Sequence, residues 1–249
     1  MSVVGLLHPG EMGSALGGAL RENGHRVLWA SEGRSAETAA RAIDFEDAGT
    51  ARDVAHAAEV VISVCPPHAA RDVAASVDGF EGIYVDANAV SPATAREIGG
   101  VDGGIVGPPP RDGATTRLYL SGPRADDVAR LFADTAVEPR VLGDQVGTAS
   151  AMKMAFASWS KGTAAMLLTV ARLAEEHGVE EPLFTEWRAW HPELLDDVER
   201  SRRSAERKGW RWVGEMEEIA DTFAAAGLPD GFHRAAAEVF RGFRRPGSS

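Results

Sequence analysis

The fold is decided by a stretch near the N-terminus that reads Val3-Val4-Gly5-Leu6-Leu7-His8-Pro9-Gly10-Glu11-Met12-Gly13-Ser14-Ala15-Leu16-Gly17-Gly18-Ala19-Leu20. Its apolar start predicts a buried strand, its central glycines predict a tight turn, and its small and apolar end predicts a helix. Glycines at such a turn let the backbone approach a phosphate, and the free N–H groups of the helix N-terminus face its negative charge. The stretch therefore predicts a site for the pyrophosphate of a dinucleotide.

The turn departs from the usual Gly-x-Gly-x-x-Gly pattern at one position. His8 stands where the first glycine is expected, whereas Gly10 and Gly13 are retained. A glycine turn in an α/β protein that binds no nucleotide would share these features. However, Gly24 is placed to end the helix and residues 25–30 read as a second strand, which favours a dinucleotide. The predicted cofactor contacts in the turn are His8, Pro9, Gly10, Glu11 and Met12.

Composition narrows the class of protein. The 249 residues suffice for one large domain or two modest ones, and the net charge of −11 argues against a nucleic-acid partner. Cys65 is the single cysteine, so no intrachain disulfide can form, which fits a reducing cytoplasm. No apolar run approaches the roughly 20 residues of a membrane span. We therefore expect a cytoplasmic protein with a small-molecule substrate and no membrane contact.

Residues 1–143 alternate between strand-like and helix-like segments, which predicts an α/β Rossmann domain with a doubly wound, mostly parallel sheet. Short connections suggest that the last two strands run antiparallel at the edge. The predicted strands are 3–7, 26–30, 60–64, 82–85, 104–106, 118–120 and 139–142. The predicted helices are 12–22, 35–43, 51–56, 68–76 and 92–98, the last with Ser91 as N-cap and Pro92 at its first position.

Residues 144–249 read as an all-α domain. The segment 145–177 lacks proline and predicts one helix of roughly 50 Å between domains. The further predicted helices are 182–190, 192–208, 210–226 and 231–243. A helical domain of this size is small for a core of its own, so we expect a homodimer built on the helical domains.

The end of the second strand indicates which cofactor is bound. NAD enzymes usually place an acidic residue there for the ribose 2′-hydroxyl, but this chain has the small, neutral Ser31. Arg34 and Ser35 are suited to a 2′-phosphate, which favours NADP. Glu32 leaves NAD open as the less favoured alternative, with the acidic residue shifted by one position.

Two loops after later strands lie where such sheets bind ligands. Cys65 and Pro66 follow the strand 60–64 and are predicted cofactor contacts, with the thiol a small buried group rather than a nucleophile. Asn88 follows the strand 82–85 and is placed to contact the nicotinamide ribose, although a turn or capping role is the alternative.

Lys153 is the predicted catalytic residue. It lies one or two turns into the long helix among small and apolar neighbours, where a lysine is costly unless it has a function. Beside a carbonyl substrate it could donate a proton as hydride arrives. Ala157 and Lys161 follow on the same helix face. Lys161 either adds a second polar group to the substrate cleft or extends to solvent.

These features together resemble the β-hydroxyacid dehydrogenase superfamily, which includes 6-phosphogluconate and 3-hydroxyisobutyrate dehydrogenases. The resemblance extends over nearly the whole chain, and residues 208–220 are similar to a less characterised, phosphogluconate dehydrogenase-like branch. It implies an NAD(P)-dependent alcohol or carbonyl oxidoreductase that is dimeric through its helical domain. Four segments carry the resemblance. Residues 10–13 resemble the cofactor loop of the family, and residues 86–92 resemble its strand-end motif. Residues 102–107 resemble its substrate segment, and residues 143–153 resemble the element that leads to its catalytic lysine.

The substrate segment departs from that family. Val106, Gly107 and Pro108 stand where the family usually has a serine and two glycines, and Ala157 replaces its asparagine. Arg111 could supply replacement charge, and the substrate could be bulkier or less acidic. The residues predict an NADP-dependent oxidoreductase, with an imine reductase or a non-enzymatic NADP-binding protein as alternatives. The histidines show no metal-ligand spacing, so no metal site is predicted.

Overall fold

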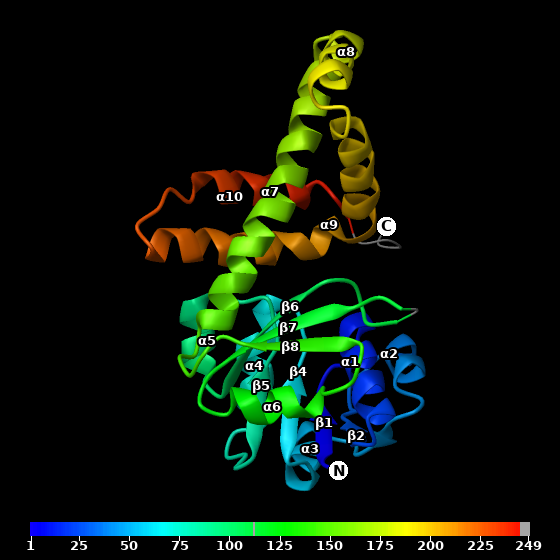
Figure 1. The fold of residues 1–249 in the computed structure, drawn as a ribbon, viewed down its shortest axis with the longest axis vertical. Helices are drawn as coiled ribbons and strands as arrows, with labels where there is room; N and C mark the ends of the chain where they lie inside the picture. Colours follow the sequence, from blue (N-terminus) through cyan, green and yellow to red (C-terminus); the bar gives the residue numbers. More distant parts are fainter. Residues whose placement is uncertain (112, 245–249) are drawn as a thin grey trace. The chain divides into compact units, whose positions relative to one another are not determined.

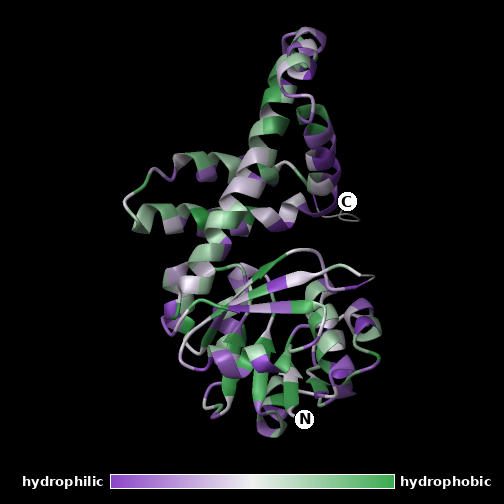
Figure 2. Cartoon of the chain, viewed as in Figure 1, coloured by the Kyte–Doolittle hydropathy of each residue, from purple (hydrophilic) through white to green (hydrophobic). Residues whose placement is uncertain are grey.

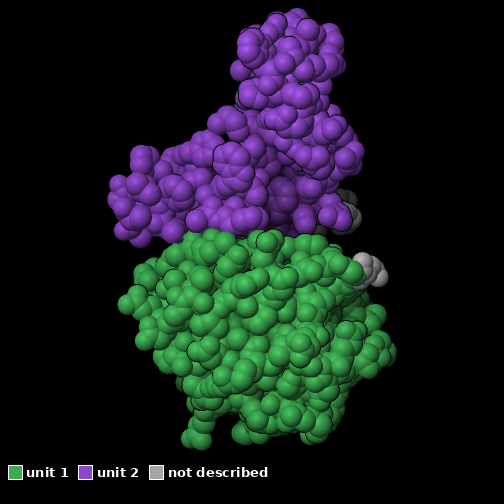
Figure 3. Space-filling model, in the orientation of Figure 1, with its two compact units in different colours: residues 1–153 green, residues 154–249 purple. Residues whose placement is uncertain are grey.

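The computed structural model describes residues 1–111 and 113–244 and divides into two compact units, residues 1–153 and 154–249 (Figure 3). The first unit is built on one sheet and the second is made of helices (Figure 1). This organisation confirms the predicted fold class, a Rossmann-like α/β region followed by an all-α region.

The sheet of the first unit has eight strands in the order β3-β2-β1-β4-β5-β6-β7-β8 (Figure 1). Strands β1 to β6 run parallel, β7 pairs antiparallel with β6, and β8 pairs parallel with β7. The last two strands therefore oppose the other six, as predicted. The strands are β1 Val3–Leu6, β2 Arg26–Trp29, β3 Glu46–Asp47, β4 Val60–Ser63, β5 Ile83–Asp86, β6 Val101–Val106, β7 Thr116–Ser121 and β8 Val137–Val141.

Helices cover both faces of this sheet, and the central strands are its most hydrophobic part (Figure 2). On one face, Leu16 and Leu20 of α1 and Val128 of α6 share a core with the strands. On the other, Val54 of α3 packs with Val61, and Val73 of α4 lies against the same cluster. The helices of this unit before α7 are α1 Glu11–Glu22, α2 Ala36–Arg41, α3 Ala51–Ala57, η1 Pro67–Ala69, α4 Ala70–Ala75, α5 Pro92–Ile98 and α6 Ala125–Leu131.

Two of these elements are absent from the sequence predictions. Strand β3 consists of two exposed acidic residues that pair with Leu28 and Trp29, so no apolar pattern marks it. Helix α6 begins with two aspartates in its first turn, and its seven residues are too few for a clear helical period. The predicted caps are confirmed, because Ser91 accepts a hydrogen bond from the Thr94 amide at the start of α5 and Gly24 follows α1 with a positive φ.

Strand β6 is displaced relative to β5 along the strand direction, so the edge of the sheet has a step at this point. Asp86, the last residue of β5, pairs with Asp102, the second residue of β6. Strand β6 therefore starts where β5 ends and continues to Val106, about 13 Å farther at roughly 3.3 Å per residue. Residues 103–106 thus extend beyond the carboxyl ends of the neighbouring parallel strands, on the side where open α/β sheets bind their ligands.

Helix α7 (Thr148–Glu176) begins in the first unit and continues through the second, which also contains α8 (Glu180–Trp190), α9 (Leu194–Ala225) and α10 (Gly231–Arg241). The prediction of two helices over 192–208 and 210–226 is wrong. Gly209 is buried inside the single helix α9, where an added Cβ would lie 3.1 Å from that of Phe243. The gold and orange parts of α9 run in different directions in Figure 1, so the helix bends without ending.

The core of the second unit is formed mainly by the pairing of α9 with α10. Met216 and Ile219 of α9 are fully buried, as is Phe240 of α10, whose ring meets Trp212 edge-on at 4.9 Å between ring centroids. A second, small cluster joins Leu167 and Ala171 of α7 to Val198 of α9. Among the described helices, none combines the length and apolar character needed to cross a membrane.

Candidate active site

Two glycines, Gly10 and Gly13, have different structural roles in the turn between β1 and α1. A Cβ on Gly13 would lie 2.3 Å from the carbonyl oxygen of His8, so only glycine lets the helix approach the strand this closely. Gly10 is the N-cap residue of α1, and a Cβ there would meet no atom within 4 Å. The space beside Gly10 lies at the N-terminus of a 12-residue helix, where unpaired N–H groups favour an anion.

His8 and Arg34 meet at this turn. Arg34 Nη1 lies 2.7 Å from His8 Nε2, and because a guanidinium can only donate, the imidazole nitrogen is the acceptor. Burial and, second, the charge of Arg34 lower the pKa of His8 to about 4. The ring is therefore neutral near pH 7, with its proton on Nδ1. At this turn, His8 Nδ1 and Arg34 Nε are both buried and have no hydrogen-bond partner among the described residues.

The residues after β2 that were predicted to select the cofactor make different contacts. Ser35 caps α2, since its hydroxyl accepts a 3.2 Å hydrogen bond from the Thr38 amide. Glu32 is exposed, and its backbone amide donates to the Gly49 carbonyl. The Ser31 carbonyl accepts from the Arg34 amide, which fixes the tight turn that carries the guanidinium. The Arg34 side chain contacts the glycine turn through His8.

A buried polar network joins the ends of β4 and β5. Asn88 accepts a hydrogen bond from the Cys65 amide and donates to the hydroxyl of Ser63 and the carboxylate of Asp86. Its side chain is thus engaged in holding the two loops together, which is the turn role weighed against ribose contact. Burial raises the pKa of the Cys65 thiol to about 11, as expected for a thiol that is not a nucleophile. Pro66 follows Cys65 as the residue before the short helix η1.

Asp102 anchors the start of helix α7. Its carboxylate accepts hydrogen bonds of 2.9 Å from the amides of Gly147 and Ser150, and one of 2.6 Å from the Ser150 hydroxyl. Ser121 completes the arrangement, because its hydroxyl donates to Asp102 and accepts from the Ala149 amide. A buried carboxylate at a helix N-terminus satisfies unpaired amides and complements the helix dipole. The sequence placed Asp102 in the substrate segment and gave no sign of this anchoring role.

Lys153 lies one turn beyond this anchor. Its Nζ donates a 2.8 Å hydrogen bond to the carbonyl of Ile105, three residues past Asp102 along β6. Gly104 permits this approach, because a Cβ there would lie 2.7 Å from the Ala149 carbonyl oxygen and 3.1 Å from the Lys153 Cβ. The ammonium is therefore held about 10 Å beyond the level at which β5 ends, at the carboxyl side of the sheet.

The predicted substrate segment lies at the end of β6. Val106 is the last residue of the strand and is buried, and Gly107 adopts a positive φ of 125°. The Pro108 carbonyl accepts a hydrogen bond from the Thr116 hydroxyl, which closes the loop on β7. Arg111 reaches back to α1, where it donates to Ser14 Oγ at 2.7 Å and to the Glu11 carbonyl. The structure thus brings Arg111 to the first turn of the candidate dinucleotide helix.

The remaining predicted substrate residues belong to the second unit. Ala157 is fully buried on α7. Lys161 pairs with Glu215 of α9 at 2.7 Å and lies over the ring of Trp212, 5.8 Å from its centroid. Both charged side chains are largely buried, so Lys161 does not extend to open solvent. In this unit its ammonium links α7 to α9.

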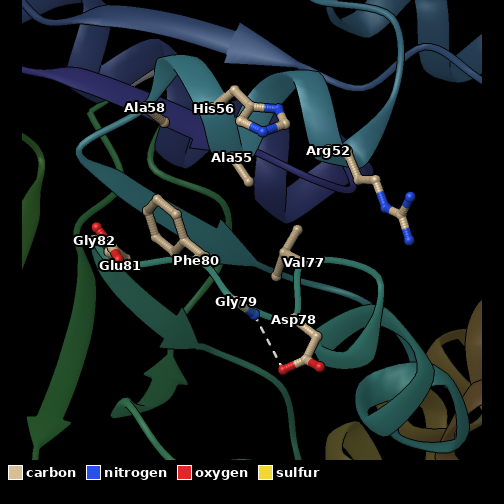
Figure 4. A pocket seen from close by; sticks show the side chains of 10 residues that line it. All are labelled: Arg52, Ala55, His56, Ala58, Val77, Asp78, Gly79, Phe80, Glu81 and Gly82. Atoms are coloured by element: carbon tan, nitrogen blue, oxygen red, sulfur yellow. Dashed lines mark hydrogen bonds between the residues drawn. The ribbon is translucent and has the colours of Figure 1, made fainter.

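A hollow of about 570 Å³ in the first unit lies away from these residues. It is formed by α3 and by the loop before β5, with His56 and Arg52 on one side and Asp78 and Phe80 on the other (Figure 4). This loop precedes β5, so the hollow belongs to the amino ends of the strands. Open α/β sheets bind ligands at the opposite edge, and we therefore place the candidate site at the glycine turn and Lys153.

Sequence comparison identifies two matching regions. Residues 3–89 match a family model described as NADP oxidoreductase coenzyme F420-dependent, and residues 174–243 match a domain of unknown function. An uncharacterized 28.5 kDa protein of Methanothermus fervidus is 29% identical over 206 residues, which are 79% of this chain and 77% of that protein.

Solved structures extend the likeness to the whole chain. A conserved protein of unknown function, itself reported as structurally similar to 3-hydroxyacid dehydrogenases, is 29% identical, with a TM-score of 0.70 over 96% of both chains. The 3-hydroxyisobutyrate dehydrogenase of Mycobacterium tuberculosis is 18% identical, with a TM-score of 0.69 over 97% of this chain and 93% of that one. A reductive aminase of Aspergillus terreus, solved with NADPH, is 17% identical, with a TM-score of 0.61 over 97% and 93%.

These findings confirm the predicted resemblance at the level of fold. The chain has the architecture of the β-hydroxyacid dehydrogenase-like superfamily. That architecture is shared by hydroxyacid dehydrogenases and by reductive aminases, so it does not distinguish a C=O from a C=N substrate.

Proposed function

We propose that the protein is an NADP-dependent oxidoreductase in which Lys153 is the general acid and base. The observation that carries the proposal is the joint placement of a glycine turn and a lysine at the carboxyl side of one sheet. Gly10 opens the N-terminus of α1 to an anion, and the ammonium of Lys153 is fixed on the protruding end of β6. The match of residues 3–89 to an NADP oxidoreductase model supports it.

The residues at the turn fit a phosphorylated dinucleotide. Arg34 forms no ion pair with a carboxylate among residues 1–111 and 113–244, and its buried Nε–H has no acceptor there. The buried Nδ1–H of His8 lacks an acceptor as well. A guanidinium with no carboxylate partner retains N–H donors on its Nη atoms for charge-assisted hydrogen bonds to a phosphate. Arg34 would hold the 2′-phosphate, and the turn from His8 to Met12 would hold the pyrophosphate.

The chemistry follows from what each group supplies. When bound, the nicotinamide supplies or accepts a hydride. Lys153 delivers a proton to the substrate oxygen or nitrogen during reduction and removes it during oxidation. The hydrogen bond to the Ile105 carbonyl orients Nζ, and the anchoring of α7 by Asp102 fixes the position of its backbone. Val106 and Pro108 offer no hydroxyl and no N–H, so we infer a substrate less acidic than a simple hydroxy acid.

A second candidate is reduction of an imine to an amine. The reductive aminase with a similar fold motivates it. A lysine can protonate nitrogen as well as oxygen, so Lys153 is compatible with both chemistries. Comparing turnover of a panel of ketones and alcohols with a panel of imines and amines decides between them. Tight NADPH binding with no turnover on either panel would favour a non-enzymatic NADP-binding protein.

We also propose that the protein is a homodimer formed through α7. Six residues on α7 recur at spacings of three and four, and we call this set the α7 seam: Phe156, Trp159, Thr163, Met166, Val170 and Leu173. Trp159 is 76% exposed and Leu173 is 58% exposed, whereas a heptad seam normally faces another helix. A second copy of the same seam is self-complementary and would bury it. The small core that α7 shares with α9 supports the same conclusion.

The first experiment is a fluorescence titration with NADPH and separately with NADH. We expect at least tenfold tighter binding of NADPH, which corresponds to about 1.4 kcal/mol. Replacing Lys153 with Met should then lower kcat by about 100-fold or more while the Kd for NADPH is unchanged. The matched control is Lys208→Met, which removes a lysine from α9 and should leave kcat unchanged. Failure to bind either nucleotide would refute the proposal.

A further inference from the structure

We infer that His8 is a specificity-determining residue: it holds the guanidinium of Arg34 at the glycine turn, in position for the 2′-phosphate of NADP(H). This inference rests on the proposed function and adds a cause for the cofactor preference. The 2.7 Å contact between His8 Nε2 and Arg34 Nη1 joins the turn after β1 to the turn after β2.

The contact gives the histidine at the first glycine position a role that glycine could not have. Glycine at that position has no side chain with which to orient an arginine. An imidazole nitrogen accepts one guanidinium N–H and restricts the rotation of a long side chain, so less conformational freedom is lost when a ligand binds. The guanidinium keeps its other donors for a ligand, because one Nη1–H is used by His8.

The surroundings of the pair favour an anion. In the part of the chain that the structure describes, Arg34 has no carboxylate within ion-pair distance, although Glu32 lies two residues away and is exposed. His8 Nδ1 and Arg34 Nε are buried donors without an acceptor among the described residues. A neutral His8 does not add positive charge of its own, so it orients Arg34 without repelling it. The pair thus presents donors and a single positive charge, which suits a phosphate monoester.

The residues near Arg34 have separate roles. The Ser35 hydroxyl is engaged in capping α2, and Glu32 is exposed. Recognition of the 2′-phosphate therefore depends on Arg34, and the strength of that recognition depends on His8. Replacing His8 should weaken binding of the phosphorylated dinucleotide and leave the unphosphorylated one nearly unaffected.

The test is binding of NADPH, NADH, adenosine 2′,5′-bisphosphate and 5′-AMP, measured by calorimetry or fluorescence on the whole protein. His8→Gly restores the usual glycine and removes the acceptor, so we expect the Kd for NADPH and for the bisphosphate to rise about tenfold. The Kd for NADH and for 5′-AMP should change less than threefold. His8→Gln keeps an acceptor near the position of Nε2 and should retain most of the preference.

A double-mutant cycle with Arg34→Ala assigns the effect to the pair. If His8 acts through Arg34, then His8→Gly should change the NADPH preference little once Arg34 is alanine. Equal discrimination by the wild type, His8→Gly and His8→Gln would overturn the inference and leave the proposed function intact, because the wild type would still bind NADPH. If His8→Gly does not fold, loss of discrimination in His8→Gln overturns the inference. A wild type that binds neither dinucleotide refutes the proposed function itself.

Discussion

Ser150 donates a 2.6 Å hydrogen bond from its hydroxyl to Asp102, whose carboxylate also accepts the Ser150 amide. The double contact fixes the first turn of α7 on the edge of β6. Because Lys153 follows on the same helix and its Nζ is held by the Ile105 carbonyl of the same strand, the geometry of the candidate catalytic group depends on this buried anchor.

Replacing Asp102 with Asn should therefore affect both stability and catalysis. The variant loses charge-assisted hydrogen bonds to buried amides, so we expect the free energy of unfolding to fall by about 2–3 kcal/mol. We also expect kcat to fall about tenfold in the folded protein, with the Kd for NADPH unchanged. Asp144→Asn is the matched control, since Asp144 is exposed in the loop before α7. An unchanged kcat would show that the anchor does not position Lys153.

The two glycines of the turn should respond differently to alanine. At Gly10 a Cβ meets no protein atom, so Gly10→Ala should change the free energy of unfolding by less than about 1 kcal/mol and weaken NADPH binding at least tenfold. At Gly13 a Cβ would clash with the His8 carbonyl, so Gly13→Ala should destabilise the protein by about 2–3 kcal/mol. Urea denaturation and fluorescence titration measure the two effects. Normal NADPH binding by Gly10→Ala would argue against a dinucleotide at this turn.

Charges in the α7 seam should dissociate the proposed dimer. The double variant Trp159→Glu and Met166→Glu places acidic groups on a face that would bury them, which is strongly unfavourable without a partner. Sedimentation velocity should show a dimer for the wild type and a monomer for the variant. Ile43→Glu is the control, because Ile43 is 81% exposed in the first unit, outside the seam. A dimer that survives the double variant would place the interface elsewhere.

His8 should make stability depend on pH. Its pKa is about 4 in the folded protein and about 6.5 when unfolded, so the unfolded state takes up the proton first as the pH falls. The free energy of unfolding should therefore decrease between pH 6.5 and pH 4, by about 1–2 kcal/mol at pH 5 after allowance for solvent screening. His8→Gln removes this contribution. Because all other titratable groups are the same in both proteins, the difference between their unfolding free energies isolates the effect of His8. Equal losses in the two proteins, without nucleotide, would contradict the burial of His8.

Much of the fold could be predicted because it rests on local patterns. The strand, turn and helix over residues 3–22, the cap at Ser91 and the opposed last strands all follow from periodicity and turn residues. Helix α9 could not be predicted as one element, because a buried glycine contacting Phe243 tolerates helical backbone where the sequence suggests a break. Strand β3 was missed because its pairing with β2, rather than its own residues, defines it.

The candidate site could be predicted only in part for a similar reason. Lys153, Gly10 and Arg34 are marked by residue type and position, whereas their partners are set by tertiary contacts. His8 looks like a departure from the glycine pattern until Arg34 is found beside it. Asp102 looks like part of a substrate segment until the amides of α7 are found on its carboxylate. Arg111 was considered from the sequence only as a possible source of charge for a substrate, and its contact with Ser14 in the first turn of α1 is a tertiary contact that the sequence does not show.

Because β6 extends beyond the end of β5 from the Asp86–Asp102 pair onward, the distance between the glycine turn and Lys153 depends on the number of residues in β6. The glycine turn follows β1. Lys153 lies on α7, and both the start of α7 and the lysine Nζ are held by residues of β6. A residue gained or lost within β6 between Asp102 and Ile105 would move the lysine contact by about 3.3 Å along the strand and turn the neighbouring side chains to the other face. Loops away from β6 and from the glycine turn can vary in length without this effect. Insertions and deletions should therefore be tolerated around the hollow beside α3 and excluded from residues 102–105.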